Sequence, residues 1–196
     1  MIQSIVFDWG GVLIEDPSEI MSQYCAKVLQ VSRQEFFRIY KKFIQDFQRG
    51  TISEHMLWES ICSELRIKQP TLSSLWGTAF RHAYVEKKEI FLLAATLKKN
   101  GYRIGLLSNT EAPAMRFFHE QQYSMFDVTV FSCAEGTRKP EERMYQILLK
   151  RLHVQPEEVI FIDDNEEYIH GAERLRINTV LFKDHRQLRK ELSSFL

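Results

Sequence analysis

Polar side chains capable of chemistry stand at or near the ends of four short apolar runs. Asp8 follows SIVF, Ser108 follows YRIGLL, Lys139 lies in AEGTRKP directly after VTVFSC, and Asp163-Asp164 follows EVIFI. Carboxylates at two such ends suit a hard divalent cation such as Mg²⁺, whereas a hydroxyl and a lysine suit an anion such as phosphate. An aspartate in line with phosphorus can attack it and form an aspartyl phosphate. The residue types therefore indicate metal-assisted chemistry on an anionic substrate.

Each position also has a plainer interpretation when it is considered alone. Asp8 could end a strand that leads into a tight turn at Gly10-Gly11, and Ser108-Asn109 could cap the next helix. The adjacent carboxylates of Asp163-Asp164 are harder to explain, because they repel each other unless a cation lies close by. The four polar ends together favour a site over four separate structural roles.

Short apolar runs alternate with helical patterns over most of the chain. Strands are predicted at 4–8, 102–109, 128–133, 158–164 and 178–182. Helices are predicted at 86–100, 112–121, 140–152 and 166–175, and in the tail, with Pro140 at the first position of its helix. Strands separated by helices imply a parallel sheet with right-handed crossovers, whose strands end together at one edge. The predicted fold class is α/β, a Rossmann-like doubly wound parallel sheet.

No strand is predicted between residues 18 and 83. Amphipathic patterns instead predict four helices, at 19–29, 33–47, 53–65 and 72–81, with Ser32 and Glu35 forming a capping box. Because this block follows the first strand, it is predicted to be an insertion near the carboxyl edge of the sheet. The predicted domains are an α/β core at 1–15 and 85–196 and a helical domain of the four-helix-bundle type at 16–84.

The composition argues against several classes of partner. Lys plus Arg and Asp plus Glu both number 26, so no strong field favours nucleic acid or an anionic membrane. No basic n-region precedes the first apolar residues, and no apolar stretch approaches a membrane span. Cys25, Cys62 and Cys133 are far apart and fit reduced packing residues. We expect a cytoplasmic protein, a monomer or weak homodimer, that binds neither nucleic acid nor membrane.

The motifs FDWGGV, LLSNT, GTRKP and FIDDN, in this order, resemble those of the haloacid dehalogenase-like hydrolase superfamily. The resemblance covers the whole chain, and the segment 16–84 is similar to that family's small helical cap. With RGTIS and RKPEERMYQILL included, the chain is most similar to small-cap sugar-phosphate phosphatases resembling bacterial α-glucose-1-phosphate phosphatase, and to the phosphatase domain of soluble epoxide hydrolase. The resemblance implies a Mg²⁺-dependent phosphatase acting on a small phosphorylated metabolite, a sugar phosphate, through an aspartyl phosphate.

The resemblance also implies roles for individual residues. Asp8 is then the nucleophile, and Lys139 stabilises both the nucleophile and the transferring group. The implied phosphate and substrate contacts are Gly10, Gly11, Ser108, Asn109 and Lys139. The implied metal ligands are Asp8, the backbone carbonyl of Gly10, Asp164, and Asp163, directly or through water. Gly11 is expected to permit the sharp turn that follows position 10.

Two positions depart from the family pattern. The family's phosphatases usually carry a second aspartate two residues after the nucleophile, as general acid and base, and here that position is Gly10. Without that proton donor, esters whose leaving group has a low pKa should suffer least. Gly10 therefore predicts a preference for anomeric sugar phosphates or other activated esters. The second departure is Tyr168, where many relatives have asparagine or aspartate.

Three other functions remain open from the sequence. A dehalogenase would use Asp8 to attack carbon, but it needs no metal, which leaves Asp163-Asp164 unexplained. A phosphonate-cleaving hydrolase is suggested because DWGG is similar to the DWAG of that subgroup, and it would need a Schiff-base lysine among Lys27, Lys41 and Lys42. The third is a non-catalytic or regulatory binding protein that kept the pocket and lost turnover.

Overall fold

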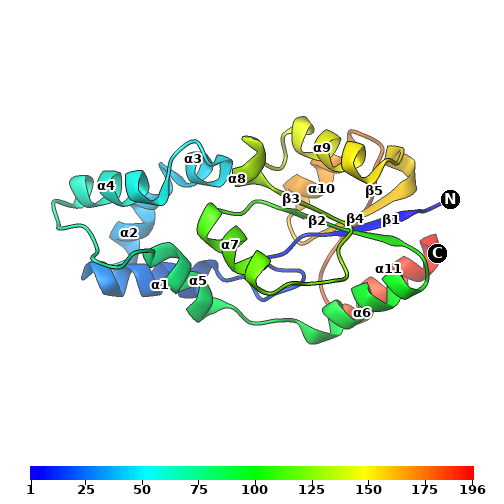
Figure 1. The fold of residues 1–196 in the computed structure, drawn as a ribbon, viewed down its shortest axis with the longest axis horizontal. Helices are drawn as coiled ribbons and strands as arrows, with labels where there is room; N and C mark the ends of the chain where they lie inside the picture. Colours follow the sequence, from blue (N-terminus) through cyan, green and yellow to red (C-terminus); the bar gives the residue numbers. More distant parts are fainter.

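The computed structural model describes residues 1–196 and contains one five-stranded, fully parallel sheet (Figure 1). Its strands are β1 (Ser4–Phe7), β2 (Arg103–Ser108), β3 (Val128–Phe131), β4 (Val159–Asp163) and β5 (Asn178–Leu181). They lie in the order β3-β2-β1-β4-β5. The chain thus builds outward from β1 first on one side and then on the other, and ligands bind beyond the strand ends at such a switch point. The prediction of an α/β doubly wound sheet is confirmed.

Helices cover both faces of this sheet. Val6 and Phe161 face α9 (Glu142–Leu152) and α10 (Glu166–Glu173) in one apolar cluster. Their strand neighbours face the opposite way, against α6 (Lys88–Lys99), α7 (Ala112–Glu120) and α11 (His185–Phe195). Successive strand residues point to opposite faces, so a strand buried on both faces needs a continuous apolar run. This requirement explains why the strands read as runs such as SIVF and VIFI.

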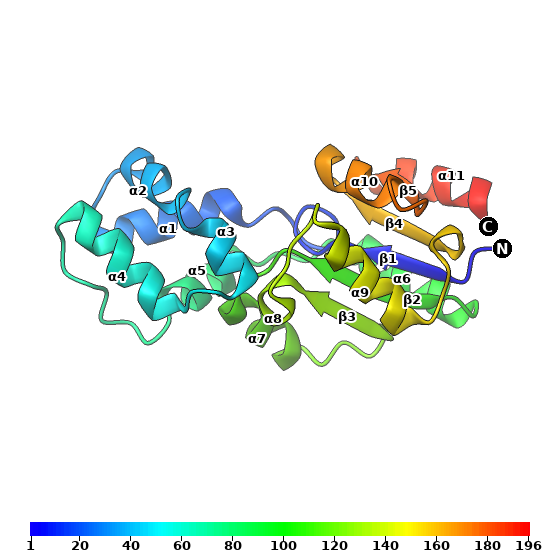
Figure 2. The same cartoon turned by 90° about the horizontal axis from the view of Figure 1, so that it is seen from above.

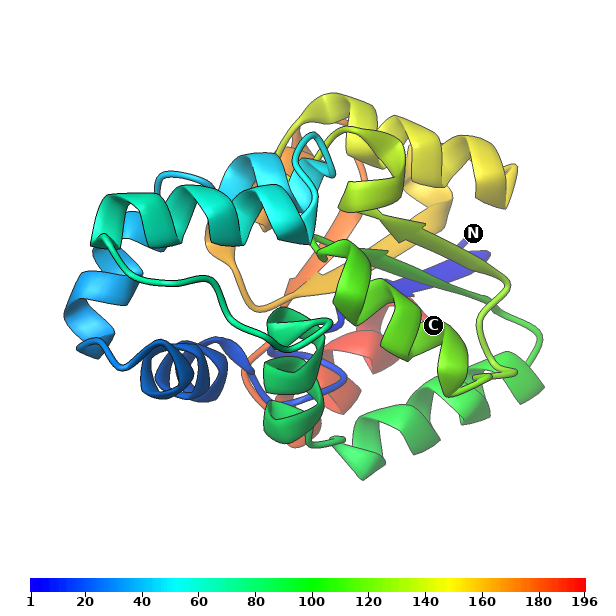
Figure 3. The ribbon, with the colours of Figure 1, turned by 60° about the vertical axis from the view of Figure 1, so that its left-hand side comes forward.

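A second group of helices lies beyond the carboxyl ends of the strands (Figures 1, 2 and 3). It consists of α1 (Ser18–Leu29), α2 (Arg33–Tyr40), α3 (Ile44–Arg49), α4 (Glu54–Leu65) and α5 (Leu75–Ala83). Aromatic side chains fill its interior: the ring of Trp76 lies 4.9 Å from that of Tyr40 and 5.6 Å from that of Phe47. None of the helices in the structure is long and apolar enough to cross a membrane.

One helix predicted in this group is in fact two. The apolar spacing of residues 33–47 predicts a single helix, but a turn at 41–43 separates α2 from α3. The turn redirects the chain toward the sheet, so that Arg49 pairs with Glu141 and Gln48 reaches the loop after β2. Contacts distant in sequence therefore override a local pattern that was consistent with one helix.

Two boundaries next to the strand ends also differ from the prediction. Pro140 lies outside α9, which begins at Glu142, and the Lys139–Pro140 peptide bond is cis. β3 ends at Phe131, because Ser132 already begins the short helix α8 (Ser132–Glu135). The Ser132 hydroxyl accepts a hydrogen bond from the N–H of Thr110, 2.9 Å away, which ties α8 to the end of β2.

Candidate active site

A backbone hydrogen bond and a buried aromatic side chain fix the chain at the end of β1. The N–H of Asp8 donates to the carbonyl of Ile162 at 2.9 Å, which extends the β1–β4 ladder and places Asp8 beside Asp163. The next side chain, Trp9, is buried with its ring 5.0 Å from that of Phe80 and 5.2 Å from that of Phe118. Because Trp9 anchors the chain here, the carboxylate of Asp8 stays at the strand end.

The turn after Asp8 requires glycine at position 11 for two independent reasons. Gly11 has φ +84°, in the left-handed region that L side chains rarely adopt. A Cβ on Gly11 would also lie 2.1 Å from Oδ2 of Asp164. The absence of a side chain at position 11 therefore lets the loop after β1 approach the carboxylate after β4.

Lys139 lies between two aspartates with its side chain fully buried. Its Nζ is 2.9 Å from Oδ1 of Asp8 and 2.5 Å from Oδ2 of Asp163. The side-chain amide of Asn109 holds the Lys139 backbone: its Oδ1 accepts from the Lys139 N–H at 2.8 Å, and its Nδ2 donates to the Lys139 carbonyl at 3.0 Å. The ammonium is thus directed at the carboxyl ends of β1 and β4 by the loop after β2.

The acidic side chains of this group are difficult to ionise together. Burial raises the pKa of Asp8 to about 6, with Lys139 acting against the shift and Asp163 adding to it. Burial likewise raises the pKa of Asp163 against the effect of Lys139, and it raises the pKa of Asp164 together with the charge of Asp8. Burial alone would lower the pKa of Lys139, but the two carboxylates outweigh it and raise that pKa. The lysine is therefore charged, and one ammonium does not offset all three carboxylates.

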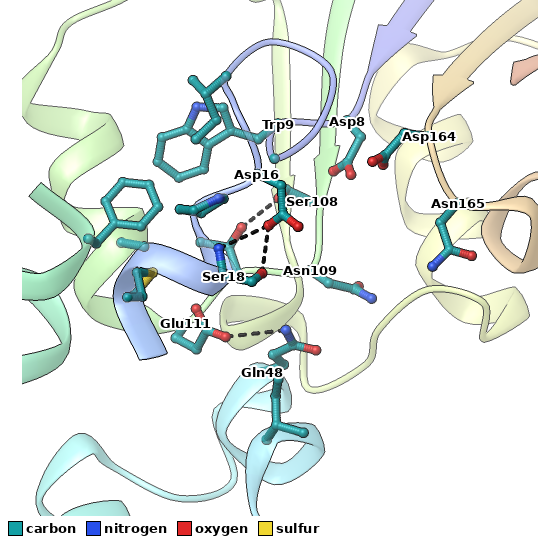
Figure 4. A pocket seen from close by; sticks show the side chains of 18 of the residues that line it. Asp8, Trp9, Asp16, Ser18, Gln48, Ser108, Asn109, Glu111, Asp164 and Asn165 are labelled. Atoms are coloured by element: carbon teal, nitrogen blue, oxygen red, sulfur yellow. Dashed lines mark hydrogen bonds between the residues drawn. The ribbon is translucent and has the colours of Figure 1, made fainter. Parts of the chain in front are cut away.

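This donor set fits a hard divalent cation. Asp8, Asp163 and Asp164 each offer a carboxylate oxygen, and these oxygens lie within 4.8 Å of one another. Both carboxylate oxygens of Asp163 already have partners within the protein. Its Oδ2 accepts from Lys139, and its Oδ1 accepts from the N–H of Asn165 at 2.9 Å. Asp164 is exposed to the pocket (Figure 4). Oxygen ligands on an anionic edge are the kind that Mg²⁺ takes.

A cavity of about 690 Å³ opens in front of these groups, within the usual size range for small-molecule sites. Five of the predicted site residues line it: Asp8, Gly10, Ser108, Asn109 and Asp164. The other three are not part of its wall; Lys139 and Asp163 are fully buried, and Gly11 is buried in the turn. The structure thus brings all eight residues together. Five of them face the cavity, and the other three are buried beside them.

The opposite wall of the cavity comes from the helical segment. Apolar and aromatic side chains dominate it: Met21, Phe37, Tyr40, Ile44, Trp76 and Phe80. Buried Glu111, three residues after Ser108, joins the two walls, because its Oε1 accepts from Gln48 at 3.2 Å and its Oε2 accepts from Trp76 Nε1 at 3.1 Å (Figure 4). Burial raises the pKa of Glu111, which these hydrogen bonds oppose. None of these wall residues was predicted; the position of Glu111 just after a strand end was the one available signal.

The side chains at the end of β2 have partners within the protein that the sequence does not predict. Ser108 Oγ lies 2.6 Å from Thr110 Oγ1, and both hydroxyls are buried at the cavity wall. Asn109 lines the cavity, but both ends of its amide are bonded to the Lys139 backbone. Tyr168, the second departure from the family pattern, also lines the cavity, and its hydroxyl accepts from Arg138 at 3.2 Å.

The sequence model of the haloacid dehalogenase-like hydrolase family matches residues 2–175. The chain belongs to this family. The predictions of the family and of a hydrolase are therefore confirmed, as is the fold class. This chain is 25% identical to the D-ribitol-5-phosphate phosphatase of Bacteroides thetaiotaomicron, over 100% of this chain and 99% of the relative.

Two further similarities cover nearly all of this chain. The chain is 28% identical to mouse acyl-CoA dehydrogenase family member 10 over 99% of its own length, but it spans only 19% of that protein. A crystal structure of a wild-type HAD family enzyme from Bacteroides thetaiotaomicron, in complex with magnesium and inorganic phosphate, matches with a TM-score of 0.78. That match covers 96% of this chain and 99% of the other at 21% identity, and it shows that the fold is shared.

Proposed function

We propose that this protein is a Mg²⁺-dependent phosphatase that cleaves a phosphate monoester of a small metabolite, a sugar phosphate, through an aspartyl phosphate on Asp8. The observation that carries the proposal is the placement of the Asp8 carboxylate. It stands at a strand end in the cavity, with Lys139 Nζ 2.9 Å behind it and the carboxylate of Asp164 beside it. A phosphatase among the relatives and a solved structure of this fold with magnesium and phosphate support the same chemistry.

The residues around Asp8 divide the work of such a reaction. In the proposed first step an Asp8 oxygen attacks phosphorus, and the bond from phosphorus to the leaving oxygen breaks. Lys139 keeps Asp8 ionised despite burial and lies close to the charge on the transferring group. The Ser108 hydroxyl and the backbone at Gly10 line the cavity where the phosphate oxygens would lie. In the second step water attacks the same phosphorus and releases the Asp8 carboxylate.

The metal would be held by Asp8, Asp164 and the Gly10 carbonyl. Asp163 is proposed to act through water or through its ion pair with Lys139, because both of its oxygens already have partners. When bound, Mg²⁺ supplies positive charge that draws the substrate phosphate to the carboxylate edge and stabilises the transition state. The charges support this assignment. Three carboxylates lie close together, and the single ammonium of Lys139 does not balance them.

The proposed sugar moiety fits the composition of the opposite wall. The aromatic residues Trp76 and Phe80 line the cavity, where the C–H groups of a sugar can pack against them. Gln48 lines the same cavity; its Oε1 accepts from Arg138 and its Nε2 donates one hydrogen to Glu111, so the second N–H of this amide can bond a hydroxyl. The helical segment 16–84 is thereby proposed as the cap domain that selects the substrate, and residues 1–15 and 85–196 as the catalytic core.

A panel of phosphate esters tests this function. The wild-type protein should release phosphate from one or more sugar phosphates with Mg²⁺ and should lose this activity in excess chelator. Asp8→Asn should abolish release while the protein stays folded, and Asp164→Asn should require more Mg²⁺. Glu64→Gln, at an exposed position of α4, is the matched control and should behave like the wild type. Undiminished release in excess chelator, or from Asp8→Asn, would refute the mechanism.

The other functions considered from the sequence have less support. A dehalogenase would place a carboxylate substrate against Asp164 and Asp8, which already repel each other. The three lysines considered for a Schiff base are exposed and do not line the cavity: Lys27, Lys41 and Lys42. A non-catalytic binding protein would bind sugar phosphate in the ester panel yet release no phosphate from any ester.

A further inference from the structure

Gly10 leaves the proposed reaction without its usual proton donor, yet its own geometry leaves space beside it. Gly10 has no left-handed φ, and a Cβ there would meet only the Cδ of Pro17, at an ordinary contact distance of 3.6 Å. The residue that borders the empty side-chain position is therefore Pro17, which directly follows Asp16 at the other end of the same loop. Gly10, Asp16 and Pro17 all line the cavity that holds Asp8.

Asp16 is oriented by its own helix. Its Oδ1 accepts from the N–H of Ser18 at 2.9 Å and from the Ser18 hydroxyl at 2.6 Å, so this carboxylate is fixed at the start of α1 (Figure 4). Both bonds use Oδ1, which leaves Oδ2 available to a ligand. In its ionised form, Asp16 also contributes to the raised pKa of Asp164, so the charges of these two carboxylates interact.

The other acidic groups of the cavity are less suited to move a proton there. Both oxygens of Glu111 already accept hydrogen bonds, from Gln48 and Trp76. The hydroxyl of Tyr168 accepts from Arg138. Glu166 is exposed in the first turn of α10 and is the one other candidate for the proton donor. Asp8 and Asp164 are assigned to the nucleophile and the metal.

We infer that Asp16 is the general acid and base of the proposed phosphatase, in place of the side chain missing at Gly10. In the first step the bond from phosphorus to the leaving oxygen breaks, and the electron pair on that oxygen takes the proton of the Asp16 carboxyl. In the second step the Asp16 carboxylate takes a proton from water while the water oxygen bonds to phosphorus and the Asp8 carboxylate departs. The second step returns Asp16 to its protonated form. This inference rests on the proposed function.

The test compares Asp16→Asn with the wild type on phosphate esters graded by the pKa of the leaving group. Asparagine keeps an amide oxygen for the Ser18 N–H, so a purely structural role of Asp16 would be preserved. We expect kcat/KM to fall by about 10² to 10⁴ for alkyl phosphates and far less for nitrophenyl phosphate. The wild type should depend only weakly on leaving-group pKa, and the preference for activated esters expected from Gly10 alone should emerge in the variant. Because the base is lost as well, acid-quenched Asp16→Asn should carry more phosphoryl group than the wild type.

Two matched variants make the outcome decisive. Glu15→Gln changes the neighbouring carboxylate, which lies 3.6 Å from Lys87 and outside the cavity, and it should leave all rates unchanged. Glu166→Gln should show no dependence on the leaving group beyond that of the wild type. A uniform loss across all esters in Asp16→Asn, no loss, or the graded loss appearing in Glu166→Gln instead would overturn the assignment. If the wild type itself releases phosphate from no ester, the proposed function fails and the assignment with it.

Discussion

Replacement of Lys139 by methionine should be far more damaging than the same change at a surface ion pair of equal length. Lys139 Nζ lies 2.5 Å from Asp163, and both side chains are 0% exposed. Lys42 Nζ also lies 2.5 Å from its partner, Glu64, but these side chains are 51% and 35% exposed. Methionine is about as long as lysine without its ammonium, so packing is similar and the charge is the main loss.

The magnitude follows from burial. Removing Lys139 leaves the carboxylates of Asp8 and Asp163, whose side chains are 10% and 0% exposed, without their counterion, a situation that costs about 3–5 kcal/mol in unfolding free energy. Lys42→Met leaves Glu64 in contact with solvent and should cost about 0.2–1 kcal/mol. Adding Asp163→Asn to Lys139→Met should recover stability, because it removes one of the two unpaired charges.

Urea unfolding in chelator, at several pH values, measures these differences. The pKa of Asp8 is about 6 in the wild type. Lys139 lowers the pKa of both Asp8 and Asp163, so its loss should raise both values further. A folded-state pKa above the unfolded one means that stability falls as pH rises through that interval. The penalty of Lys139→Met should therefore shrink as pH is lowered toward about 5, as the carboxyls become protonated. A penalty no larger than that of Lys42→Met, or one independent of pH, would refute this reasoning.

Three other changes have defined outcomes. Gly11→Ala should weaken Mg²⁺ binding in a titration, because the new Cβ would lie 2.1 Å from Oδ2 of Asp164 and would push that carboxylate away. Wild-type affinity would contradict this. Gly50→Ala, whose Cβ would lie 2.2 Å from the Cys133 carbonyl, should loosen α3 and raise KM for sugar phosphates more than for a small aryl phosphate. As pH rises above 4.5, the ordinary glutamate value, Glu111→Gln should gain stability relative to the wild type, because burial raises the Glu111 pKa and the wild type loses stability as Glu111 ionises. Parallel urea-unfolding stabilities across these pH values would exclude that effect.

The clustering of the site could be predicted because strand order and direction follow from simple rules. Asp8 directly follows β1, Ser108 and Asp163 end β2 and β4, and parallel strands joined by crossovers present those ends at one edge. The turn at Gly11 was also expected. Its second cause, the approach of the Asp164 carboxylate, was not, because that contact joins residues far apart in the chain.

Residue types alone could not predict which hydrogen-bond partner each side chain of the site takes. An asparagine after a strand can bond substrate, cap a helix or hold a loop, and at Asn109 the backbone of Lys139 takes both ends of the amide. The break between α2 and α3 was hidden for a related reason. The apolar spacing of 33–47 is consistent with one helix, and only the docking of Gln48 and Arg49 onto the core favours two.

The stereochemical course at phosphorus tests the central claim most directly. A substrate whose transferred phosphoryl group is made chiral with oxygen isotopes and sulfur, hydrolysed in isotopically labelled water, reports how many in-line displacements occur. Transfer first to Asp8 and then to water comprises two displacements, so the account predicts net retention of configuration. Net inversion would mean that water attacks the substrate in a single step, and it would contradict the role proposed for Asp8.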